Sequence, residues 1–587
     1  MSDDMGIEKI DLDEVDWRGS RDFFESLGQA LDKLDDKDES YDFTWVGKRK
    51  SIIEAGAPIN KTFRPDVENS KNWDTTENLF IEGDNLDALK LLQESYLGKV
   101  KMIYIDPPYN TGKDFVYHDN FKAEVEEYDE ATEYKDQAGN IQFKKNDKNN
   151  GRYHSDWLSM MYPRLKLARN LLRDDGIIFI SIDDHEQPTL RRLCDEIFGE
   201  DNFIANLVWD TNHSAQAGIF KVYHQYVLVY ARNASEITVP SISEGDDFEA
   251  GAQKRHSPRH PESEFRFPAG TRWDAKNGIE LRGVWGDAER SELVSGRMLC
   301  VDGKLQEDVT IRASWTQKSQ MEQFFYGDAD NLVDSRGQKI KEFYFSATGK
   351  IKIVKSRGVI TPPTVRREYG SQNSISNALA DLFGLNESPF DSPKPPEMIR
   401  EFSEWFTNPK DIVLDFFAGS ATAAHAVMLQ NAIDAGSRKY ILVTLNEEVG
   451  SGTAAARAGF KTIPEISRER IRRAGDKIAA EHPEAKVDYG FRALRIDDTN
   501  YKEVYKSAGE LQQSALLDVV DNIKDDRTEL DLLYGVITQS ALELNRPLET
   551  REIAGSKVFL YDYFGEVSGL VACFSDSISE EAIKEIA

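Results

Sequence analysis

The chain has 587 residues, of which 40% are hydrophobic and 30% charged, with a formal net charge of −30 at pH 7. A chain of this length is too long to fold around one hydrophobic core of ordinary size, so we expect three to four domains. No apolar run is long enough to span a bilayer, and the acidic start, Met1-Ser2-Asp3-Asp4-Met5, does not resemble a signal peptide, so we expect a cytoplasmic protein with no membrane partner. The excess of acid opposes indiscriminate binding of polyanions but leaves room for a local basic groove.

The three cysteines, Cys194, Cys300 and Cys573, are far apart and lack the spacing of metal ligands. We expect free thiols in a reducing compartment and no bound metal. The chemistry of this chain must therefore come from other residue types.

The N-terminal part alternates between polar stretches and short apolar runs. Residues 1–75 are acidic with few clear strands, and we expect a capping segment there. A strand is predicted at 78–82, followed by the turn Gly83-Asp84-Asn85, a helix over 86–96 with leucines on one face, and a second strand over 100–105. This order predicts a βαβ unit and a parallel sheet.

The second strand ends at the tetrapeptide Asp106-Pro107-Pro108-Tyr109. The amine on an adenine ring is a poor nucleophile, because its lone pair is delocalised into the ring. The Asp106 carboxylate and the Pro107 carbonyl can each accept a hydrogen bond from one of the two N–H groups of this amine. The Tyr109 ring offers a flat face on which a base turned out of a duplex can stack. A plain strand-ending turn, capped by Asp and stopped by Pro, is the competing interpretation.

Strands and helices alternate over 78–200, the composition begins to change at about 204, and the apolar run 227–230 is still expected in the sheet, so 76–234 is predicted to be one half of a core. The polar stretch 110–152 predicts a long loop or insertion. A helix over 157–172, a buried strand over 177–182 and a helix through 197 follow it.

The composition changes over 235–385, where Gly, Pro, Trp, Arg and Ser become frequent. We expect a separate module with a basic surface that bears Trp273, Trp285 and Trp315 and contacts DNA phosphates and base edges. The candidate DNA contacts are Lys254, Arg255, Arg259, Lys355, Arg357, Arg366 and Arg367. For any single one of them, a solvated and charge-balanced surface is the alternative.

The core pattern resumes over 386–487, with a predicted helix over 395–406 and a strand over 412–414 that runs into Asp415–Thr422. Gly419 permits a sharp turn close to a ligand, and the absence of a Lys-Ser/Thr pair gives no sign of a triphosphate. A further strand over 440–445 ends near Glu447, whose carboxylate suits ribose hydroxyls. Asp84 can accept from an adenine amino group or cap the helix that follows it.

The order of the two motifs resembles that of amino-group DNA methyltransferases of the permuted β class, in which the catalytic motif precedes the recognition domain and the cofactor loop follows. Four stretches are more specifically similar to the Mod subunits of Type III restriction-modification systems. They are residues 79–86, 103–112, 390–395 and 463–471.

The resemblance implies an α/β fold: a Rossmann-like, S-adenosylmethionine-dependent methyltransferase sheet, circularly permuted, with a target-recognition domain inserted at 235–385 and a C-terminal α/β domain at 488–587. The implied activity is adenine-specific methylation at N6 in double-stranded DNA by base flipping. The implied partners are a second copy of the chain in a homodimer and an ATP-dependent Res subunit.

The resemblance also assigns site residues. Asp106, Pro107, Pro108 and Tyr109 are expected to be catalytic. The expected cofactor residues are Asp84, Lys394, Pro395, Asp415, Phe417, Ala418, Gly419, Ser420, Thr422 and Glu447.

The chain departs from the family pattern in two places within the cofactor half. Ala421 stands where a second glycine is usual, and Asn446 where a proline is usual. The chain also stops at Ala587 within a predicted helix, so we expect a truncated or shorter C-terminal domain. Two alternatives stay open: cytosine-N4 methylation, disfavoured by Asp rather than Ser at 106, and a catalytically weak specificity subunit that targets a partner nuclease, disfavoured by Asp106 and Tyr109.

Overall fold

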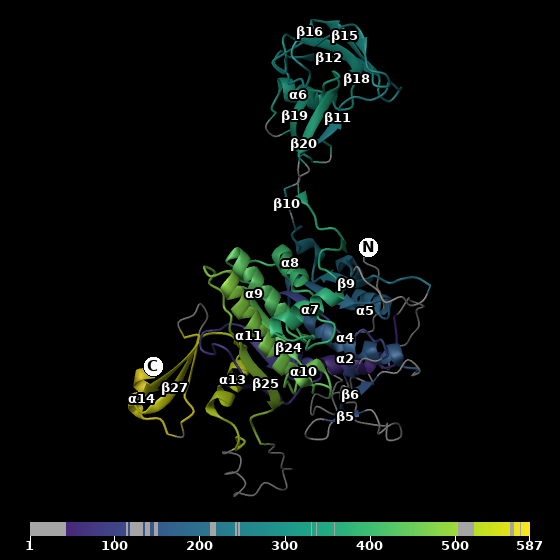
Figure 1. Ribbon diagram of the computed structural model, residues 1–587. Helices are drawn as coiled ribbons and strands as arrows, with labels where there is room; N and C mark the ends of the chain where they lie inside the picture. The colour runs from purple at the N-terminus through teal and green to yellow at the C-terminus, as the bar shows by residue number, and fades with distance from the viewer. Residues whose placement is uncertain are drawn as a thin grey trace, which may run out of the picture. The chain divides into compact units, whose positions relative to one another are not determined.

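The computed structural model describes most of the chain from residue 43 onward (Figure 1). The described ranges are 43–112, 151–211, 219–240, 247–329, 332–335, 337–356, 359–502, 522–563, 569–575 and 577–586, with short strands at 115–117, 133–135, 141–145 and 243–244. The chain forms two compact units, Val239–Pro363 and the remainder. Among the helices of the described ranges, none combines the length and apolarity needed to cross a membrane.

The larger unit is built on one ten-stranded sheet, ordered β1-β25-β2-β24-β23-β3-β7-β9-β8-β22. The six strands from β25 to β7 are parallel to their neighbours, while β1 and β9 run antiparallel. The bounds in sheet order are Lys61–Pro65, Arg492–Asp498, Leu79–Glu82, Lys439–Thr444, Ile412–Asp415, Val100–Ile105, Leu172–Ile182, His224–Ala231, Phe203–Asp210 and Val365–Arg366. The predicted permuted α/β fold is confirmed, because β3 precedes its neighbour β23 by most of the chain.

Helices cover both faces of this sheet because the parallel strands are apolar on both sides. Along β3, Ile103 and Ile105 pack into one hydrophobic cluster, whereas Met102 and Tyr104 pack into the other. The first cluster includes side chains of α3 (Asn85–Tyr96), α4 (Tyr153–Leu171), α5 (Gln187–Phe198) and α13 (Glu529–Gln539). The second includes side chains of α7 (Gln372–Phe383), α8 (Pro396–Phe406), α9 (Thr422–Asp434) and α11 (Ile463–Glu481).

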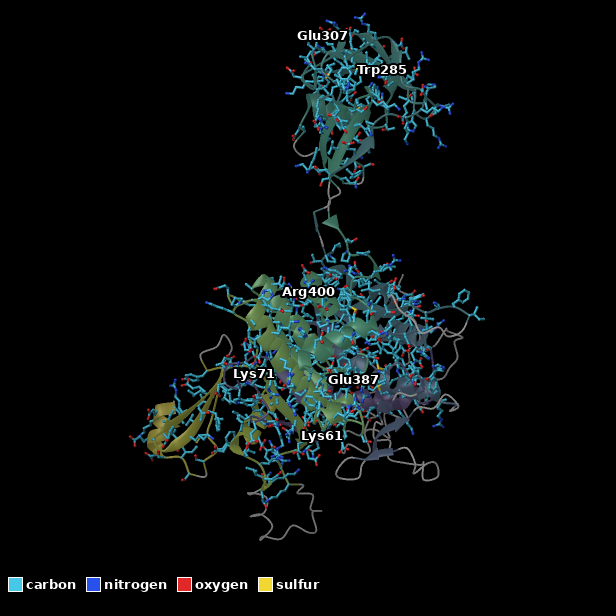
Figure 2. The ribbon with its side chains drawn as sticks, viewed as in Figure 1. Lys61, Lys71, Trp285, Glu307, Glu387 and Arg400 are labelled. Carbon is cyan, nitrogen blue, oxygen red and sulfur yellow. The ribbon has the colours of Figure 1, made fainter. Side chains whose placement is uncertain are left out.

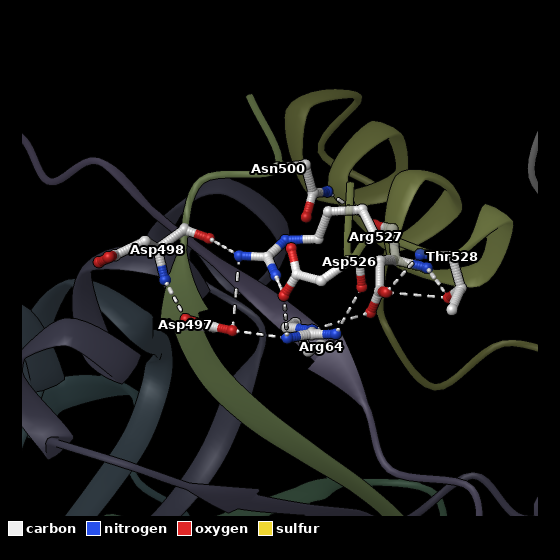
Figure 3. Close-up of polar contacts among 8 residues, drawn as sticks. Arg64, Asp497, Asp498, Asn500, Asp526, Arg527 and Thr528 are labelled. Carbon is white, nitrogen blue, oxygen red and sulfur yellow. Dashed lines mark hydrogen bonds and ion pairs between the residues drawn. The ribbon is translucent and has the colours of Figure 1, made fainter. Parts of the chain in front are cut away.

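Segments near the two ends of the described chain meet at one edge of the sheet. β1 pairs with β25, and α2 (Lys48–Gly56) packs on α4. Arg64 on β1 donates to Asp497 at 2.9 Å and to Asp531 at 3.3 Å. Arg527 lies 3.5 Å from the same Asp497 and pairs with Asp526 at 2.5 Å (Figure 3). These ion pairs tie the segment before α13 to the edge strands.

Smaller elements complete the larger unit. The stretch 110–152, predicted as a long loop or insertion, contains a three-stranded sheet, β4-β6-β5. A second small sheet, β26-β27-β28, precedes the C-terminal helix. The bounds are β4 Phe115–Tyr117, β5 Glu133–Lys135, β6 Ile141–Lys145, β26 Leu548–Ile553, β27 Ser556–Tyr561, β28 Leu570–Ala572, α10 Ala454–Arg457, α14 Glu580–Ile586, and the 3-10 turns η2 Glu200–Asn202 and η3 Ala234–Glu236.

The smaller unit is a set of short antiparallel strands around an aromatic core, with Trp285 and Glu307 on it in Figure 2. Trp273 and Trp315 are buried in that core, so the expected surface position of these two tryptophans is wrong. The elements are β10 Ser243–Glu244, β11 Asp247–Gly251, β12 Glu262–Phe267, β13 Glu280–Leu281, β14 Val284–Trp285, β15 Ser291–Ser295, β16 Met298–Val301, β17 Lys304–Leu305, β18 Val309–Ser314, α6 Lys318–Tyr326, β19 Ile340–Phe345, β20 Ile351–Ser356 and β21 Val359–Ile360.

This unit is shorter than the module expected at 235–385. β22 joins the larger sheet beside β8, and α7 packs against α11. Residues 364–385 therefore belong structurally to the larger unit, because their apolar side chains complete its second cluster.

Candidate active site

Polar residues gather at the carboxyl ends of the central strands of the main sheet. These strands are parallel, so their carboxyl ends lie on the same side of the sheet. Asp106 follows β3, Asp415 ends β23, and Asp84 follows β2. The Asn85 side chain donates to the carbonyl of Phe416 at 2.8 Å, which joins the turn after β2 to the turn after β23. The carboxyl ends of parallel strands are where α/β sheets bind ligands.

The Asp106 carboxylate faces a buried lysine. Lys394 Nζ lies 2.9 Å from Asp106 Oδ2 and 4.9 Å from the centre of the Tyr109 ring, although these residues come from opposite halves of the predicted core. The other oxygen, Asp106 Oδ1, is buried and has no hydrogen-bond partner among the described residues. Because an ionised carboxylate only accepts hydrogen bonds, Oδ1 is positioned to accept an N–H from a ligand.

The rest of the tetrapeptide is held by the neighbouring elements. Trp157 Nε1 on α4 donates to the Pro108 carbonyl at 2.8 Å, and the Tyr109 hydroxyl donates to Gln225 on β9 at 3.0 Å. Burial, and next the charge of Asp106, raise the pKa of Tyr109 well above its usual value, so the phenol stays neutral. The Tyr109 ring is therefore a fixed, uncharged surface.

The residue after the tetrapeptide anchors the turn. Asn110 is buried with φ of +59°, a left-handed conformation that asparagine tolerates better than most residues. Its side chain donates to Glu186 Oε1 at 2.6 Å, and His154 Nδ1 contacts the same oxygen at 2.6 Å. The fully buried Glu186 thus links the turn after β3 to the start of α4.

The loop after β23 begins with a buried acid. Asp415 accepts from the backbone N–H of Phe417 at 3.0 Å and is 2% exposed. Burial raises the pKa of Asp415 well above its usual value, and the nearby Asp106 raises it further. An acid held in this way favours a ligand that brings hydrogen-bond donors or positive charge.

The glycine of this loop is needed for its backbone. Gly419 has φ of +45°, and a Cβ there would lie 3.0 Å from the Phe390 ring. Ala421, the N-cap of α9, also has a positive φ, +63°, although it carries a side chain. The loop therefore forms with alanine where the family pattern has glycine.

Asp84 and Glu447 follow β2 and β24, two neighbouring strands on the same side of β23. Asp84 caps α3 by accepting from the backbone of Leu86 at 2.8 Å, and its other oxygen lies 3.4 Å from Arg164. Glu447 is exposed, yet the surrounding protein partly desolvates its carboxyl group, and this desolvation raises the pKa of Glu447. These contacts establish the capping interpretation of Asp84 and leave both acids near the loop.

The candidate DNA contacts divide between the two units. Lys254, Arg255 and Arg259 are exposed on the smaller unit, while Lys355 is buried there against Asp334 at 2.7 Å. Arg366 and Arg367 lie on the larger unit: Arg366 is buried against Glu401, and Arg367 is exposed and lies 3.2 Å from Asp210. Arg357 lies outside the described residues. The expectation that Lys355 and Arg366 lie on an open basic surface is therefore wrong.

Sequence reasoning missed the partners that hold the site. Asn110 lies in the stretch 103–112, which is similar to Mod subunits, but the similarity assigned it no function. The same holds for Ser467 and Arg470 in the stretch 463–471, which bond Gly419 and Ser420 of the loop after β23. For Gln225 and Glu186, no sequence feature pointed to the site. In the described ranges, no cluster of three His, Cys, Asp or Glu side chains forms a metal site.

With this geometry established, comparison with known proteins identifies the class. The family model for DNA methylases of the N6/N4 type matches residues 100–450, more than half of the chain. The chain is 34% identical to the Type III restriction-modification enzyme StyLTI Mod subunit of Salmonella typhimurium, over 79% of this chain and 67% of that protein. It is 32% identical to the EcoPI Mod subunit of Escherichia phage P1, over 79% of this chain and 72% of that protein.

A third relative matches a larger share of the chain. The EcoP15I Mod subunit of Escherichia coli is 27% identical over 93% of this chain and 84% of that protein. The class defined by the fold and the site is a DNA methylase. Within that class, the chain belongs to the family of Type III Mod subunits.

The cofactor of this class is S-adenosylmethionine, and the donor set at the sheet edge fits it. Asp415 and Glu447 can accept from amino and hydroxyl groups, Ser420 and Thr422 carry hydroxyls, and Phe390 offers an apolar ring beside Gly419. S-adenosylmethionine presents an adenine ring, ribose hydroxyls, an amino group and a carboxylate, each of which has a suitable counterpart in this set.

Proposed function

We propose that this chain transfers a methyl group from S-adenosylmethionine to N6 of an adenine turned out of double-stranded DNA. The proposal is carried by Asp106, whose Oδ2 is paired with Lys394 while its buried Oδ1 lacks a partner among the described residues. An adenine amino group brings two N–H donors, and one of them supplies the hydrogen bond that Oδ1 lacks.

The catalytic turn acts by orienting the amine. With Asp106 accepting one N–H and the Pro107 carbonyl the other, the nitrogen moves towards tetrahedral geometry and its lone pair becomes available. Tyr109 supports the base by stacking, and Pro108 keeps the turn rigid. Proximity supplies much of the rate, and Asp106 need not be a strong base because the proton can leave after the attack.

The residues after β23 are proposed to hold the cofactor. S-adenosylmethionine, when bound there, supplies an electrophilic methyl group. Lys394 belongs to both the catalytic and the cofactor sites of this proposal. It pairs with Asp106, and it directly precedes Pro395, the N-cap of α8, which is itself a proposed cofactor residue. The proposed cofactor residues are Asp84, Lys394, Pro395, Asp415, Phe417, Ala418, Gly419, Ser420, Thr422 and Glu447.

The smaller unit is proposed to recognise the target sequence. Its exposed residues Lys254, Arg255 and Arg259 are suited to phosphate contacts. We propose further that the chain works with the partners its family resemblance implies, a second copy and a Res subunit. Light scattering of the purified chain, alone and with such a subunit, measures both associations.

The test is single-molecule sequencing of native DNA from cells that express the chain alone. We expect N6-methyladenine at one position of one short asymmetric motif. Asp106→Ala should abolish the signal while the purified variant still binds S-adenosylhomocysteine. Asp498→Ala is the matched control, because Asp498 is an exposed aspartate at the end of β25 in the same sheet.

Other outcomes would replace the proposal. N4-methylcytosine would assign the other base. An active Asp106→Ala variant would overturn the role of the tetrapeptide. An unmodified genome, together with a protein that fails to bind the cofactor, would favour a specificity subunit without catalysis.

A further inference from the structure

Three side chains from the first turns of α11, all in the stretch 463–471, contact the loop after β23 and the end of β2. Ser467 Oγ donates to the Gly419 carbonyl. Arg468 Nη1 pairs with Glu82, the last residue of β2, at 2.8 Å. Arg470 Nη1 donates to Ser420 Oγ at 2.6 Å and to Thr422 Oγ1 at 2.8 Å. None of these three residues is among the proposed catalytic or cofactor residues.

Arg470 is a buried cation without a paired acid. It is 2% exposed, and no carboxylate in the described part of the chain lies within ion-pair distance of it; Glu397 acts on it only at longer range. Its Nε has no hydrogen-bond partner among the described residues. Burial lowers the pKa of Arg470 to about 9, so the guanidinium remains charged at neutral pH. A buried charge that lacks a counter-charge is costly to the fold.

The surroundings of Arg470 reflect this uncompensated charge. His425 on α9 is half-buried, with its Nδ1 inaccessible to solvent, and its pKa falls to about 3 through desolvation and next through the charge of Arg470. His425 is therefore neutral and offers no compensation. An anion bound beside the start of α9 would provide the missing negative charge, and the N-terminal end of that helix favours an anion as well.

The hydrogen-bond directions indicate how Arg470 acts on a ligand. Guanidinium N–H groups can only donate, so Ser420 Oγ and Thr422 Oγ1 must accept from Arg470. The two hydroxyls also lie 3.5 Å apart in a long hydrogen bond in which either can be the donor, so at least one O–H is left to donate to a further acceptor. A carboxylate can accept from both hydroxyls in place of that contact, with the positive charge of Arg470 behind them.

We propose that Arg470 is a positioning residue for the carboxylate of S-adenosylmethionine, acting through the hydroxyls of Ser420 and Thr422. This inference rests on the proposed function, because the proposed function supplies the ligand, S-adenosylmethionine. It gives the stretch 463–471 a role: Ser467 holds the backbone of the loop, and Arg470 sets the polarity of its hydroxyls.

The test compares two ligands by isothermal titration calorimetry on the full chain. One is S-adenosylhomocysteine, and the other is its decarboxylated analogue, which lacks only the carboxylate. Arg470→Met should weaken S-adenosylhomocysteine about tenfold or more, as expected for the loss of a charge-assisted contact, and the analogue by less than about threefold. Arg470→Lys should recover part of the loss because it restores the charge.

A second route leaves Arg470 in place. The double variant Ser420→Ala, Thr422→Val removes both hydroxyl donors and should show the same selective loss. Arg473→Met is the control, since Arg473 lies one turn further along α11 and contacts Glu469 and the Phe383 carbonyl, and it should bind both ligands as the native chain does.

Two results would overturn the inference. One is an equal loss for both ligands in the Arg470 and hydroxyl variants, which would mean a structural role alone. The other is no loss for either ligand. A native chain that binds neither ligand would instead count against the proposed function.

Discussion

Ala421 shows how a single residue can hold a conformation that its side chain disfavours. Its φ of +63° places it in the left-handed region, which costs a residue with a Cβ roughly 1–2 kcal/mol. Its methyl group is fully buried among Ala423, Ala424 and other apolar residues. The strain persists because contacts to Ser420 and Thr422 on either side hold the turn.

Replacing Ala421 with glycine separates strain from packing. Ala421→Gly loses a buried methyl but relieves the strain, so we expect the free energy of unfolding to stay within about 0.5 kcal/mol or to rise. Ala426→Gly is the control: it also loses a fully buried methyl, but inside helix α9, and should lower the free energy of unfolding by about 1–2 kcal/mol. Urea denaturation measures both, and equal losses would contradict the strain assigned to Ala421.

At the scale of elements, the segment 254–260 places three basic side chains close together on the smaller unit. Several arginines elsewhere on this unit are paired with acids, such as Arg266 with Asp308 at 2.6 Å and Arg312 with Glu264 at 2.7 Å. Lys254, Arg255 and Arg259 are exposed, and none has an ion pair within the described ranges. Because charge that is not neutralised locally attracts phosphate, this segment is the best candidate for DNA contact on the unit.

Neutralising two of these residues should weaken DNA binding through salt-dependent contacts. For Lys254→Gln combined with Arg255→Gln, the slope of log affinity against log salt should fall by up to about 2, roughly one per phosphate contact. Fluorescence anisotropy with duplex DNA at several salt concentrations measures it. Arg312→Gln should leave the slope unchanged, and an unchanged slope in the double variant would remove this segment from the interface.

At the scale of the molecule, each unit has its own hydrophobic core, and surface ion pairs neutralise individual carboxylates of a chain whose net charge is −30. Lys61 pairs with Asp87 at 3.0 Å and Lys71 with Asp476 at 2.9 Å (Figure 2). The two connections to the smaller unit run side by side, because β10 and β21 pair in antiparallel fashion. Separate cores joined by a narrow pair of strands favour independent folding.

Removal of the smaller unit should therefore leave a folded cofactor-binding core. If residues 245–358 are replaced by Gly-Asn-Gly between β10 and β21, we expect cooperative unfolding and affinity for S-adenosylhomocysteine within about twofold of the native chain. Site-specific methylation should be lost. Asp106→Ala in the full chain is the complementary control, retaining DNA binding without methylation. Persistent methylation of the same motif would show that the larger unit alone reads the target.

Local patterns in the sequence were enough to predict the parallel core and the chemistry at its edge. Apolar runs such as 100–105 and 412–414 must be buried, and a parallel sheet brings the polar residues after them, Asp106 and Asp415, to the same side. The resemblance of four short stretches added the family and the cofactor, and the order of the catalytic motif and the cofactor loop, which is read directly from the sequence, indicated the permuted class.

Tertiary structure alone decided which side chains meet. Two contacts join residues that are far apart in the chain: the ion pair of Lys394 with Asp106 and the hydrogen bond from Arg470 to Ser420. The burial of Lys355 and Trp273 depends on how the strands pack. Local periodicity reports which face of an element is apolar, and it carries no information about the partner across a core. Charge and aromatic content over 235–385 therefore predicted a basic surface, whereas packing placed part of that set inside.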